Sequence, residues 1–500
     1  MAEVFFGVTG LVGTIDVCIK WGRALAQACD DYRQAEANLE ETLVRIQNCW
    51  LRALAKLEVA KKLEGTISDE QRDVQQRVFT ILGTKLENVT LILSKCVQRP
   101  ALNLATRFQL VRRKDALEGA LDDLESWERQ YQPSWFAFLK HADPSVDTAL
   151  EKIIQSAPAV TAESSSVSVQ FRRALKESSD ASRIVFIREE AFQGFTREII
   201  MYSKAQVATR APDDRQFIVD TVTGGAVTQK DARDFARRLR HSDPLTFGLL
   251  ECKGVVRYPE TMDFLFRIPD GYTDIHSLRH LLLSGQAHDS LSDRLDMAQK
   301  LARAVHSVHL YGFVHKSICP ETILGFRKPE SQALPSMVSL VGFQVIRNAD
   351  GNTHRVTDMR WEYNLYRHPR RQGQSVQYYI MQHDIYSLGV CLLEVGLWES
   401  LVAYDSNQVA HPSMALGLDG NGHLRSPDAL KDHLVSLSRS TVLRTRVGTK
   451  YSEVVETCLT CLDQGNLNFG DESEFQDEDG VVVGERYIEK VLGILNDISL

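Results

Sequence analysis

The stretch Phe313–Leu324 has the sequence FVHKSICPETIL and carries more information about this chain than any other segment. Residues 291–311, directly before it, repeat apolar side chains at helical spacing. The repeat consists of Leu295, Ala298, Leu301, Ala302, Val305 and Val308. Apolar residues also flank the stretch itself, so the sequence predicts a polar loop that follows a long helix.

This loop resembles the catalytic loop of protein kinases, whose pattern is H-R-D-L-x-x-x-N. His315 matches, but Ser317 takes the place of the catalytic aspartate and Thr322 that of the metal-binding asparagine. A serine hydroxyl cannot replace a carboxylate as a base at neutral pH. Neither residue is a strong ligand for a hard divalent cation. The resemblance therefore implies a kinase fold from which the chemistry has been lost.

A segment after this loop resembles the kinase D-F-G motif. Gly342-Phe343-Gln344 follows the apolar run 337–341, where the strand that leads to D-F-G belongs. Phe343 matches the motif, whereas Gly342 replaces the metal-binding aspartate and Gln344 replaces the glycine. The resemblance assigns these three residues to a degenerate cofactor-binding position.

Two structural landmarks of kinases follow in the same order. Tyr366-Arg367-His368-Pro369 resembles the end of an activation loop, with Pro369 in the place of the A-P-E proline. The segment DIYSLGV, which begins at Asp384, resembles the buried kinase helix D-x-W-S-x-G-V. In kinases this aspartate binds the backbone of the catalytic loop. The resemblance thus implies structural roles for Asp384 and Pro369.

The segment before the loop lacks the residues with which a kinase holds ATP. A glycine-rich loop is needed over the phosphates, but residues 183–215 offer only Phe192-Gln193-Gly194-Phe195. Phe217–Val222 fits the third strand and contains no lysine, and the helix predicted over 229–241 contains no glutamate. We therefore expect a pseudokinase with no cofactor and no metal, while weak ATP binding without Mg²⁺ stays an open alternative.

Residues 1–156 show the pattern of long amphipathic helices. Apolar stripes predict helices near 36–63, 69–96 and 114–130, with Pro133 ending the last one. The inward residues expected for them are Leu39, Leu43, Ile46, Trp50 and Leu57, then Val74, Val78, Ile81, Val89 and Ile92, and finally Leu117, Leu121, Leu124 and Trp127. Helices of similar length joined by short breaks predict an antiparallel bundle.

The first helix, predicted from Val4 onward, is unusually apolar. Asp16 is its only charged residue up to Ile19. One interpretation is a core helix of the bundle, and the other is a segment that also enters a membrane. The candidate membrane-contact residues are Val4, Phe5, Val8, Leu11 and Ile15.

A change of composition separates the two halves of the chain. Residues 157–182 include a run rich in serine and threonine that is typical of a linker. Short strand-like pieces follow at 184–187, 217–222 and 262–268, and helical patterns come after them. The predicted fold class is α+β, with a helical bundle over 1–156, a linker over 157–182 and a two-lobed kinase-like domain over 183–500.

The N-terminal helices resemble the HeLo and HeLo-like family of fungal cell-death domains, which includes the HET-S prion-inhibition and propagation domain. The resemblance rests on Val4–Val12, Asp16–Gly22 and Leu117–Trp135. Cys252–Val255 and Leu265–Pro269 resemble the divergent kinase-like domains that follow such N-termini. The resemblance implies a layout similar to that of the mixed-lineage-kinase-like necroptosis executioners, in which a pseudokinase regulates killer helices.

Composition limits the classes of function. The net charge of −8 gives no sign of nucleic-acid binding, and 43% hydrophobic with 25% charged residues is typical of a soluble globular protein. Nine cysteines, mostly far apart, favour a reduced chain over a disulfide framework. Cys458 and Cys461 form a lone CxxC, which favours helix packing over a zinc site.

Together these patterns predict a cytoplasmic signalling or cell-death protein that moves to the plasma membrane on activation. The kinase-like domain would restrain the bundle until an upstream protein or kinase acts, for example near Thr353 or Thr357. The bundle would then oligomerise with other copies and contact membrane lipids. The alternatives are a divergent but active Ser/Thr kinase that binds ATP and a non-enzymatic scaffold.

Overall fold

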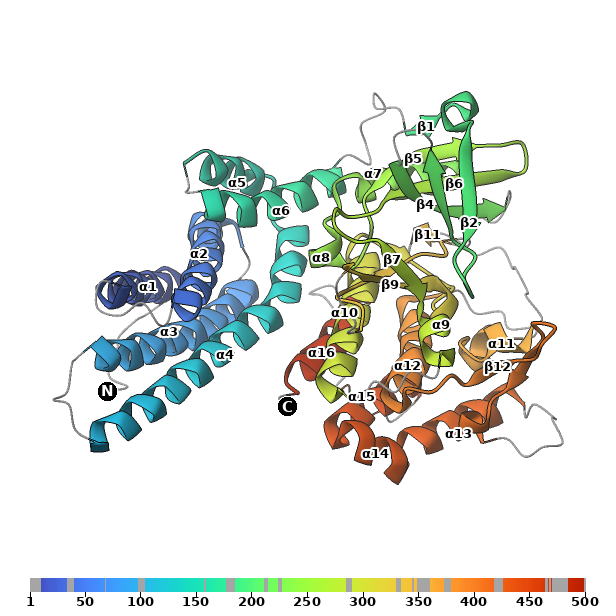
Figure 1. Ribbon diagram of the computed structural model, residues 1–500. Coiled ribbons are helices and arrows are strands. Elements are labelled where there is room, and N and C mark those ends of the chain that lie inside the picture. Colours follow the sequence, from blue (N-terminus) through green and yellow to red (C-terminus); the bar gives the residue numbers. More distant parts are fainter. Residues whose placement is uncertain are drawn as a thin grey trace. The chain divides into compact units, whose positions relative to one another are not determined.

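The structure of the chain is a computed structural model. It describes residues 10–33, 40–67, 69–97, 104–156, 159–176, 185–210, 215–223, 227–284, 290–329, 334–343, 346–348, 360–372, 379–417, 426–463, 466, 469 and 484–498. The chain divides into two compact units, Met1–Arg173 and Ala174–Leu500, called here the N-terminal and C-terminal units. The fold class is α+β, as predicted: helices occupy about residues 11–176, and a region of mixed sheet and helices follows (Figure 1).

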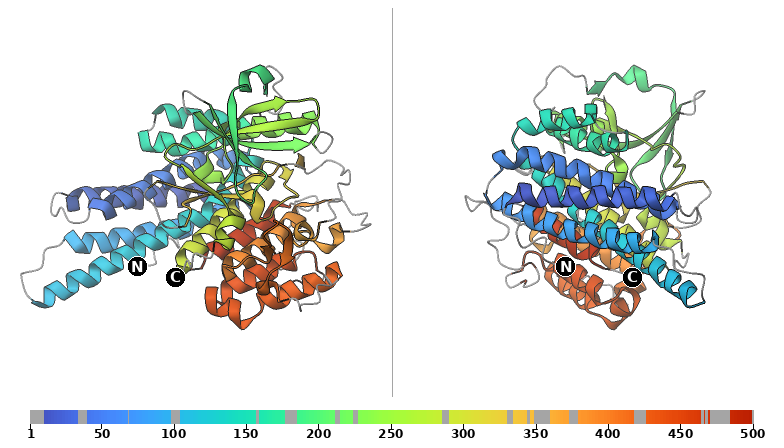
Figure 2. Two further views of the ribbon diagram at one scale, coloured as in Figure 1. Left: turned by 45° about the vertical axis from the view of Figure 1, so that its right-hand side comes forward. Right: turned by 90° about the vertical axis from the view of Figure 1, so that its left-hand side faces the viewer.

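Long helices build the N-terminal unit. They are α1 (Leu11–Arg33), α2 (Glu40–Leu63), α3 (Asp69–Val97), α4 (Leu104–His141), α5 (Ser145–Ser156) and α6 (Ala159–Lys176). α1 packs mainly against α3, and α3 also packs against α4; the long helices run side by side in both views of Figure 2. The stripe predicted for α2 is confirmed, because Leu43, Ile46, Trp50 and Leu57 are buried. Leu39 lies outside the described residues.

The inward face predicted for α3 is partly wrong. Val74 and Ile81 are 48% and 51% exposed. Val89 is buried, as predicted, and the helix also buries Phe79, Leu82, Leu86 and Leu93. These residues form a stripe at helical spacing that is rotated from the predicted one. This buried stripe faces the bundle.

Two boundaries in this region also differ from the predictions. Pro133 does not end its helix, since α4 continues to His141. A proline inside a helix costs about 3 kcal/mol. Burial of Trp135, Phe136, Phe138 and Leu139 after it offsets that cost at roughly 1.5–3 kcal/mol per side chain.

The expected linker over 157–182 is largely helical, because α6 covers Ala159–Lys176. The serine-rich composition did not indicate the tertiary contacts that hold this helix. Phe171 is fully buried, and the guanidinium of Arg172 donates to the carbonyl oxygens of Leu139 and Ala142 at 2.6 and 2.9 Å. It also pairs with Asp147 at 2.9 Å. These contacts fix α6 on the end of α4 and on α5.

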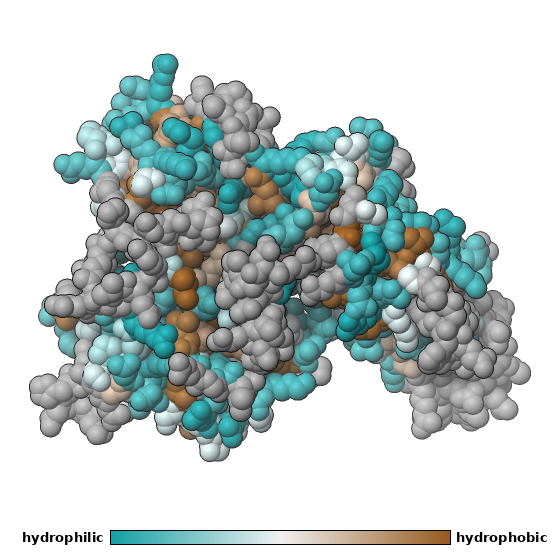
Figure 3. All heavy atoms as spheres, turned by 180° about the vertical axis from the view of Figure 1, so that it is seen from behind, coloured by the Kyte–Doolittle hydropathy of each residue, from teal (hydrophilic) through white to brown (hydrophobic). Residues whose placement is uncertain are grey.

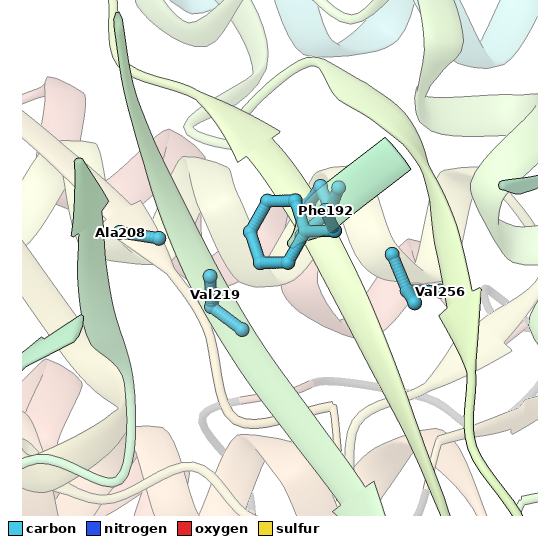
Figure 4. Close-up of a cluster of buried hydrophobic side chains, with 5 residues drawn as sticks. Phe192, Ala208, Val219 and Val256 are labelled. Atoms are coloured by element: carbon cyan, nitrogen blue, oxygen red, sulfur yellow. The ribbon is translucent and has the colours of Figure 1, made fainter. Parts of the chain in front are cut away.

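The C-terminal unit begins with a sheet in the order β1-β5-β6-β4-β3-β2. Its strands are β1 (Phe186–Ile187), β2 (Phe195–Ile199), β3 (Gln206–Arg210), β4 (Arg215–Thr223), β5 (Cys252–Arg257) and β6 (Thr261–Arg267). All neighbours pair antiparallel except β1 and β5. Phe192, from the 3-10 turn η4 (Glu189–Phe192), covers one face among Ala208, Val219 and Val256 (Figure 4). The sheet, with α7 (Gln229–Arg238) and α8 (Pro244–Phe247), is called the sheet part below.

The rest of the C-terminal unit is mostly helical and is called the helical part. Its helices are α9 (Leu278–Leu283), α10 (Leu291–Leu310), α11 (Trp361–Asn364), α12 (Met381–Leu397), α13 (Pro427–Ser438), α14 (Thr441–Val447), α15 (Thr449–Leu459) and α16 (Glu485–Asn496). Short strands accompany them: β7 (Asp274–Ser277), β8 (Phe313–Val314), β9 (Ile323–Arg327), β10 (Met337–Leu340), β11 (Arg347–Asn348), β12 (Val402–Tyr404) and β13 (Ala410–Pro412). α12 is buried along its whole length and forms the centre of this part.

Within the described ranges, no helix is both long and apolar enough to cross a membrane. On the face drawn in Figure 3, hydrophilic residues predominate among the coloured atoms, and hydrophobic residues occupy small areas.

Candidate functional site

The loop between α10 and β9 carries the residues that the sequence analysis singled out. It runs from β8 through the 3-10 turn η6 (Pro320–Thr322) into β9. The hydroxyl Oγ1 of Thr322 donates to the carbonyl oxygen of Ser317 at 2.8 Å and accepts from the backbone N–H of Cys319 at 3.1 Å. Thr322 thus closes the loop with its hydroxyl, while Ser317 is half-buried.

Asp384, at the start of α12, accepts hydrogen bonds from the backbone of this loop. The residue is fully buried, and both carboxylate oxygens accept two hydrogen bonds each. Oδ2 accepts from the backbone N–H of His315 at 2.8 Å and pairs with Nε2 of His309 at 3.0 Å. Oδ1 accepts from the backbone N–H of Lys316 at 2.9 Å and from the hydroxyl of Tyr379 at 2.7 Å. Asp384 therefore lies where the sequence analysis expected it.

The electrostatics of Asp384 favour a carboxylate. Burial by itself would raise its pKa, but the hydrogen bond and charge of His309 and the bond from Tyr379 hold the pKa below its ordinary value. The fixed charge also supports Lys316, whose backbone has φ of +68°. A non-glycine residue rarely adopts this conformation without such support.

His315 connects the loop with the segment before Gly342. Its ring nitrogen Nε2 lies 3.0 Å from the carbonyl oxygen of Val341, and Nδ1 accepts from the backbone N–H of Ser317 at 3.3 Å. These roles place the proton on Nε2. Burial lowers the pKa of His315 to about 4, so the ring is neutral at physiological pH. A neutral, doubly bonded imidazole is a structural link between the two segments.

Gly342 and Thr322 are packed against each other. Gly342 has φ of +81°, and a Cβ atom added there would lie 2.3 Å from Cγ2 and 2.8 Å from Cβ of Thr322. The backbone N–H of Val341 also donates to the carbonyl oxygen of Thr322 at 2.9 Å. The two positions that the resemblance equates with metal ligands are therefore occupied by a bare backbone and a methyl group.

Asp220, on the central strand β4, is a site residue that the sequence analysis missed. It is fully buried, and its Oδ2 accepts from the backbone N–H groups of Gly342 at 2.9 Å and Phe343 at 2.7 Å. Among the described residues, its other oxygen, Oδ1, has no hydrogen-bond partner. Burial raises the pKa of Asp220 to about 6. The available signal was a lone carboxylate within the apolar strand sequence FIVDTV.

Phe343 fills the space between the sheet and helical parts. It is 1% exposed, and its ring centroid lies 4.5 Å from that of Phe235 and 4.9 Å from that of His315. Phe266, on β6, lies 5.9 Å away. The aromatic residue kept in the D-F-G-like segment is thus part of a shared core.

A buried ion-pair network includes Glu321, a residue of the loop between α10 and β9. Arg279, on α9, is fully buried and donates through Nε to Oε1 of Glu321 and through Nη1 to Oε1 of Glu394, both at 2.9 Å. It also donates to Oγ of Ser400 and to the hydroxyl of Tyr366, both at 2.6 Å. We call these five residues the Arg279 network. The sequence does not reveal the central residue of this network, because an isolated arginine in SLRHLLL carries no sign of burial.

The remaining candidate residues of this unit are structural or undescribed. Pro369 is buried at the first position of the 3-10 turn η7 (Pro369–Arg371), where Nδ1 of His368 accepts from the backbone N–H of Arg370 at 3.2 Å. Gln344, Thr353 and Thr357 lie outside the described residues.

The candidate membrane-contact residues belong to α1 and the segment before it. Leu11 and Ile15 are buried in the N-terminal unit, at 1% and 0% exposure. Val4, Phe5 and Val8 lie outside the described residues.

Two further contacts hold α1 in place. Asp16 pairs with Lys61 of α2 at 2.5 Å. Gly22 lies against the indole of Trp50, where an added Cβ would come within 2.0 Å of a ring carbon.

The chemistry available to this site is limited. Asp220, Glu321 and Asp384 are carboxylates of the region, and each is buried and accepts hydrogen bonds from protein groups. In the described part of the chain, no three His, Cys, Asp or Glu side chains are placed to hold a metal ion. The described arrangement is suited to holding segments together.

No protein-family model matches the chain, and a search of curated proteins finds no match for it either.

Proposed function

We propose that this protein is a cell-death or signalling protein in which a kinase-like domain without phosphoryl-transfer activity controls a membrane-targeting helical bundle. The proposed kinase-like domain is the C-terminal unit, and the sheet and helical parts are its two lobes. The N-terminal unit is the proposed HeLo-like effector. In the resting state the protein is cytoplasmic, and on activation the effector oligomerises at the plasma membrane.

The proposal of an inactive kinase is supported by what occupies the catalytic positions. Phosphoryl transfer needs a base, metal ligands and a cation near the phosphates. Ser317 and Thr322 supply hydroxyl groups instead, and Gly342 has no side chain. A buried carboxylate, Asp220, lies on the strand that would carry the cation, and a carboxylate would repel phosphate.

The proposal of a releasable effector is carried by one observation: a row of apolar side chains on α1 is buried within the N-terminal unit. Leu11, Ile15, Cys18 and Leu25 have exposures of 0–1%. Each large buried side chain favours an apolar environment by roughly 1.5–3 kcal/mol. The bundle supplies that environment at rest, and a lipid surface or a second copy would supply it after release.

The expected mode of membrane contact is interfacial. Asp16 remains at the helix surface, and an unpaired carboxylate is costly in the hydrocarbon region. α1 would therefore lie at the boundary between headgroups and acyl chains, with its charged face outward. Release would require breaking the Asp16–Lys61 pair and separating Gly22 from Trp50.

Liposome leakage with two matched glycine variants tests this function. Gly22→Ala forces a Cβ into the ring of Trp50 and should loosen α1 in the full-length protein. Gly119→Ala is the control, because no described atom lies within 4 Å of an added Cβ on this α4 residue. We expect Gly22→Ala to raise dye release from anionic vesicles and Gly119→Ala to leave it at the wild-type level.

The same experiment has an outcome that rejects the proposal. Hydrogen exchange of α1 peptides shows whether Gly22→Ala has loosened the helix. If α1 exchanges faster and neither the full chain nor residues 1–173 alone release dye, the effector function is wrong. The non-enzymatic scaffold then becomes the better explanation.

A further inference from the structure

The hairpin between β2 and β3 reaches from the sheet part to the helical part of the C-terminal unit (Figure 1). At its tip, Oγ of Ser203 donates to the carbonyl oxygen of Glu321 at 2.7 Å. The carbonyl oxygen of Met201 accepts from Oγ of Ser277, the residue that caps α9, at 2.7 Å. Two hydrogen bonds therefore join this tip to two different elements of the helical part.

Aromatic and cationic contacts add to these bonds. The ring of Tyr202 lies 5.0 Å from that of Tyr404, and the hydroxyl of Tyr404 donates to Oε1 of Glu321 at 3.1 Å. The ammonium group of Lys204 lies 5.2 Å from the ring centre of Tyr363 on α11. The tip of the hairpin thus sits on residues that also contact the Arg279 network.

The backbone of the tip is held in an unfavourable conformation. Tyr202 has φ of +54°, which a bulky non-glycine residue seldom adopts. Such a conformation persists only where surrounding contacts determine it. Hydrogen bonds within the hairpin close the turn, since the N–H of Ser203 donates to the carbonyl oxygen of Ile200 at 2.9 Å. The side chains of Tyr202 and Ser203 and the carbonyl of Met201 contact the helical part, so the attachment adds to the support of this strained turn.

A second attachment, made by Asp220, joins the sheet part and the helical part at another place. Asp220 extends from the sheet and accepts the backbone N–H groups of Gly342 and Phe343, which belong to the helical part. The carboxylate is buried, and its Oδ1 is unpartnered among the described residues. This attachment is therefore made at the expense of desolvating a carboxylate, and it is not needed to complete the sheet itself.

We propose that the hairpin tip Met201–Lys204 and Asp220 form a two-point latch that holds the sheet part on the helical part in one closed arrangement. The two points open together, because both join the same two bodies. Opening frees the strained turn and the buried carboxylate at once, which lowers the free energy needed to separate the parts. The latch is a property of the C-terminal unit alone and does not depend on the proposed effector function.

Hydrogen exchange on the full-length protein tests the latch. Breaking either contact should speed exchange at the other. Ser203→Ala removes the bond to Glu321 and also the acceptor of the Ala205 N–H within the hairpin, so the informative readout is the distant segment. Thr196→Ala is the matched control, because its hydroxyl bonds only the carbonyl of Thr209 within the same sheet. For Ser203→Ala we expect exchange to rise roughly 3- to 10-fold in the hairpin and also at the amides of Gly342 and Phe343. Asp220→Leu should conversely accelerate exchange at residues 200–205.

Three results would overturn the latch. If Ser203→Ala accelerates only its own hairpin, the two contacts are independent. If α10 and α12 accelerate equally, the contacts only support global stability. If neither segment exchanges faster, the bond from Ser203 to Glu321 does not stabilise the closed arrangement. Asp220→Asn keeps an acceptor oxygen for both N–H groups, so residues 200–205 should exchange no faster than in the wild type, which separates loss of the bond from loss of the charge.

Discussion

The methyl carbon Cγ2 of Thr322 lies 2.3 Å from the point that a Cβ atom on Gly342 would occupy. The side chain of Thr322 therefore leaves no room for a side chain at position 342. An aspartate cannot enter position 342 while Thr322 keeps its methyl group, and the backbone at 342 has φ of +81°. Placing a metal-binding aspartate at this position would therefore require at least two coordinated changes.

We expect Gly342→Ala to destabilise the C-terminal unit by about 2–4 kcal/mol, from the left-handed backbone and from overpacking. Gly271→Ala is the control, because Gly271 has φ of +82° but no described atom within 4 Å of an added Cβ. Thr322→Ser keeps the hydroxyl bonds and removes the methyl group, so it should recover about 1 kcal/mol in a double-mutant cycle. Denaturant unfolding measures all four variants, and equal losses at positions 342 and 271 would contradict the clash.

The full-length protein should not transfer phosphate from ATP. The proposed inactive kinase-like domain implies this, because Ser317, Thr322 and Gly342 stand where phosphoryl transfer would need a base and metal ligands. A single-turnover assay with labelled ATP and either Mg²⁺ or Mn²⁺ measures it, with Ser317→Ala expected to match the wild-type background. Transfer clearly above background that disappears in Ser317→Ala or Asp220→Ala would favour the divergent active kinase.

The stability of the C-terminal unit should depend on pH through Asp220. Its pKa is raised from 3.8 to about 6 in the folded protein, so the folded state holds this proton more tightly than the unfolded state does. The resulting stabilisation is complete below about pH 4 and is lost as pH rises through 6. At 1.36 kcal/mol per unit, the loss is on the order of 3 kcal/mol.

Asp220→Asn isolates this effect, because an amide does not ionise and still offers an oxygen to both N–H groups. The stability difference between the variant and the wild type should grow in favour of asparagine from pH 4 to pH 7. Chemical unfolding at several pH values measures that difference. A difference that stays constant with pH would mean that Asp220 is not the group that titrates.

Replacing Leu11 and Ile15 together with glutamate should abolish dye release by residues 1–173. The double substitution detaches α1 from the bundle and also removes its apolar face, whereas Gly22→Ala leaves that face intact. Val74→Glu with Ile81→Glu is the control, because both residues are about half exposed on α3. In the full-length protein, the thermal transition of the C-terminal unit should stay unchanged in both variants. Leakage that survives the α1 double substitution would rule out α1 as the membrane contact.

Local sequence patterns predicted the features that depend on local spacing. The helices corresponding to α2, α3 and α10 were expected near their observed positions, and Asp384 was expected beside the backbone of His315. The face of α3 was partly mispredicted, because two apolar stripes overlap on that helix and only tertiary packing selects between them.

Residues whose role depends on distant partners could not be found this way. Asp220 and Arg279 are charged, and single charged residues are usually exposed. Asp220 is buried because it accepts backbone N–H groups more than a hundred positions away. Arg279 is buried because it pairs with two glutamates and two hydroxyl groups. The course of α4 through Pro133 likewise depends on the burial of the residues that follow it.

The Arg279 network also constrains the order in which the chain can mature during synthesis. Arg279 leaves the ribosome first, and its partners follow 42 to 121 residues later. Until Ser400 has emerged, a guanidinium and two carboxylates that are destined for the interior remain without their full set of partners, and burying them would be strongly unfavourable. The helical part therefore completes its folding late in translation, and nascent chains that stop before residue 400 are expected clients of chaperones.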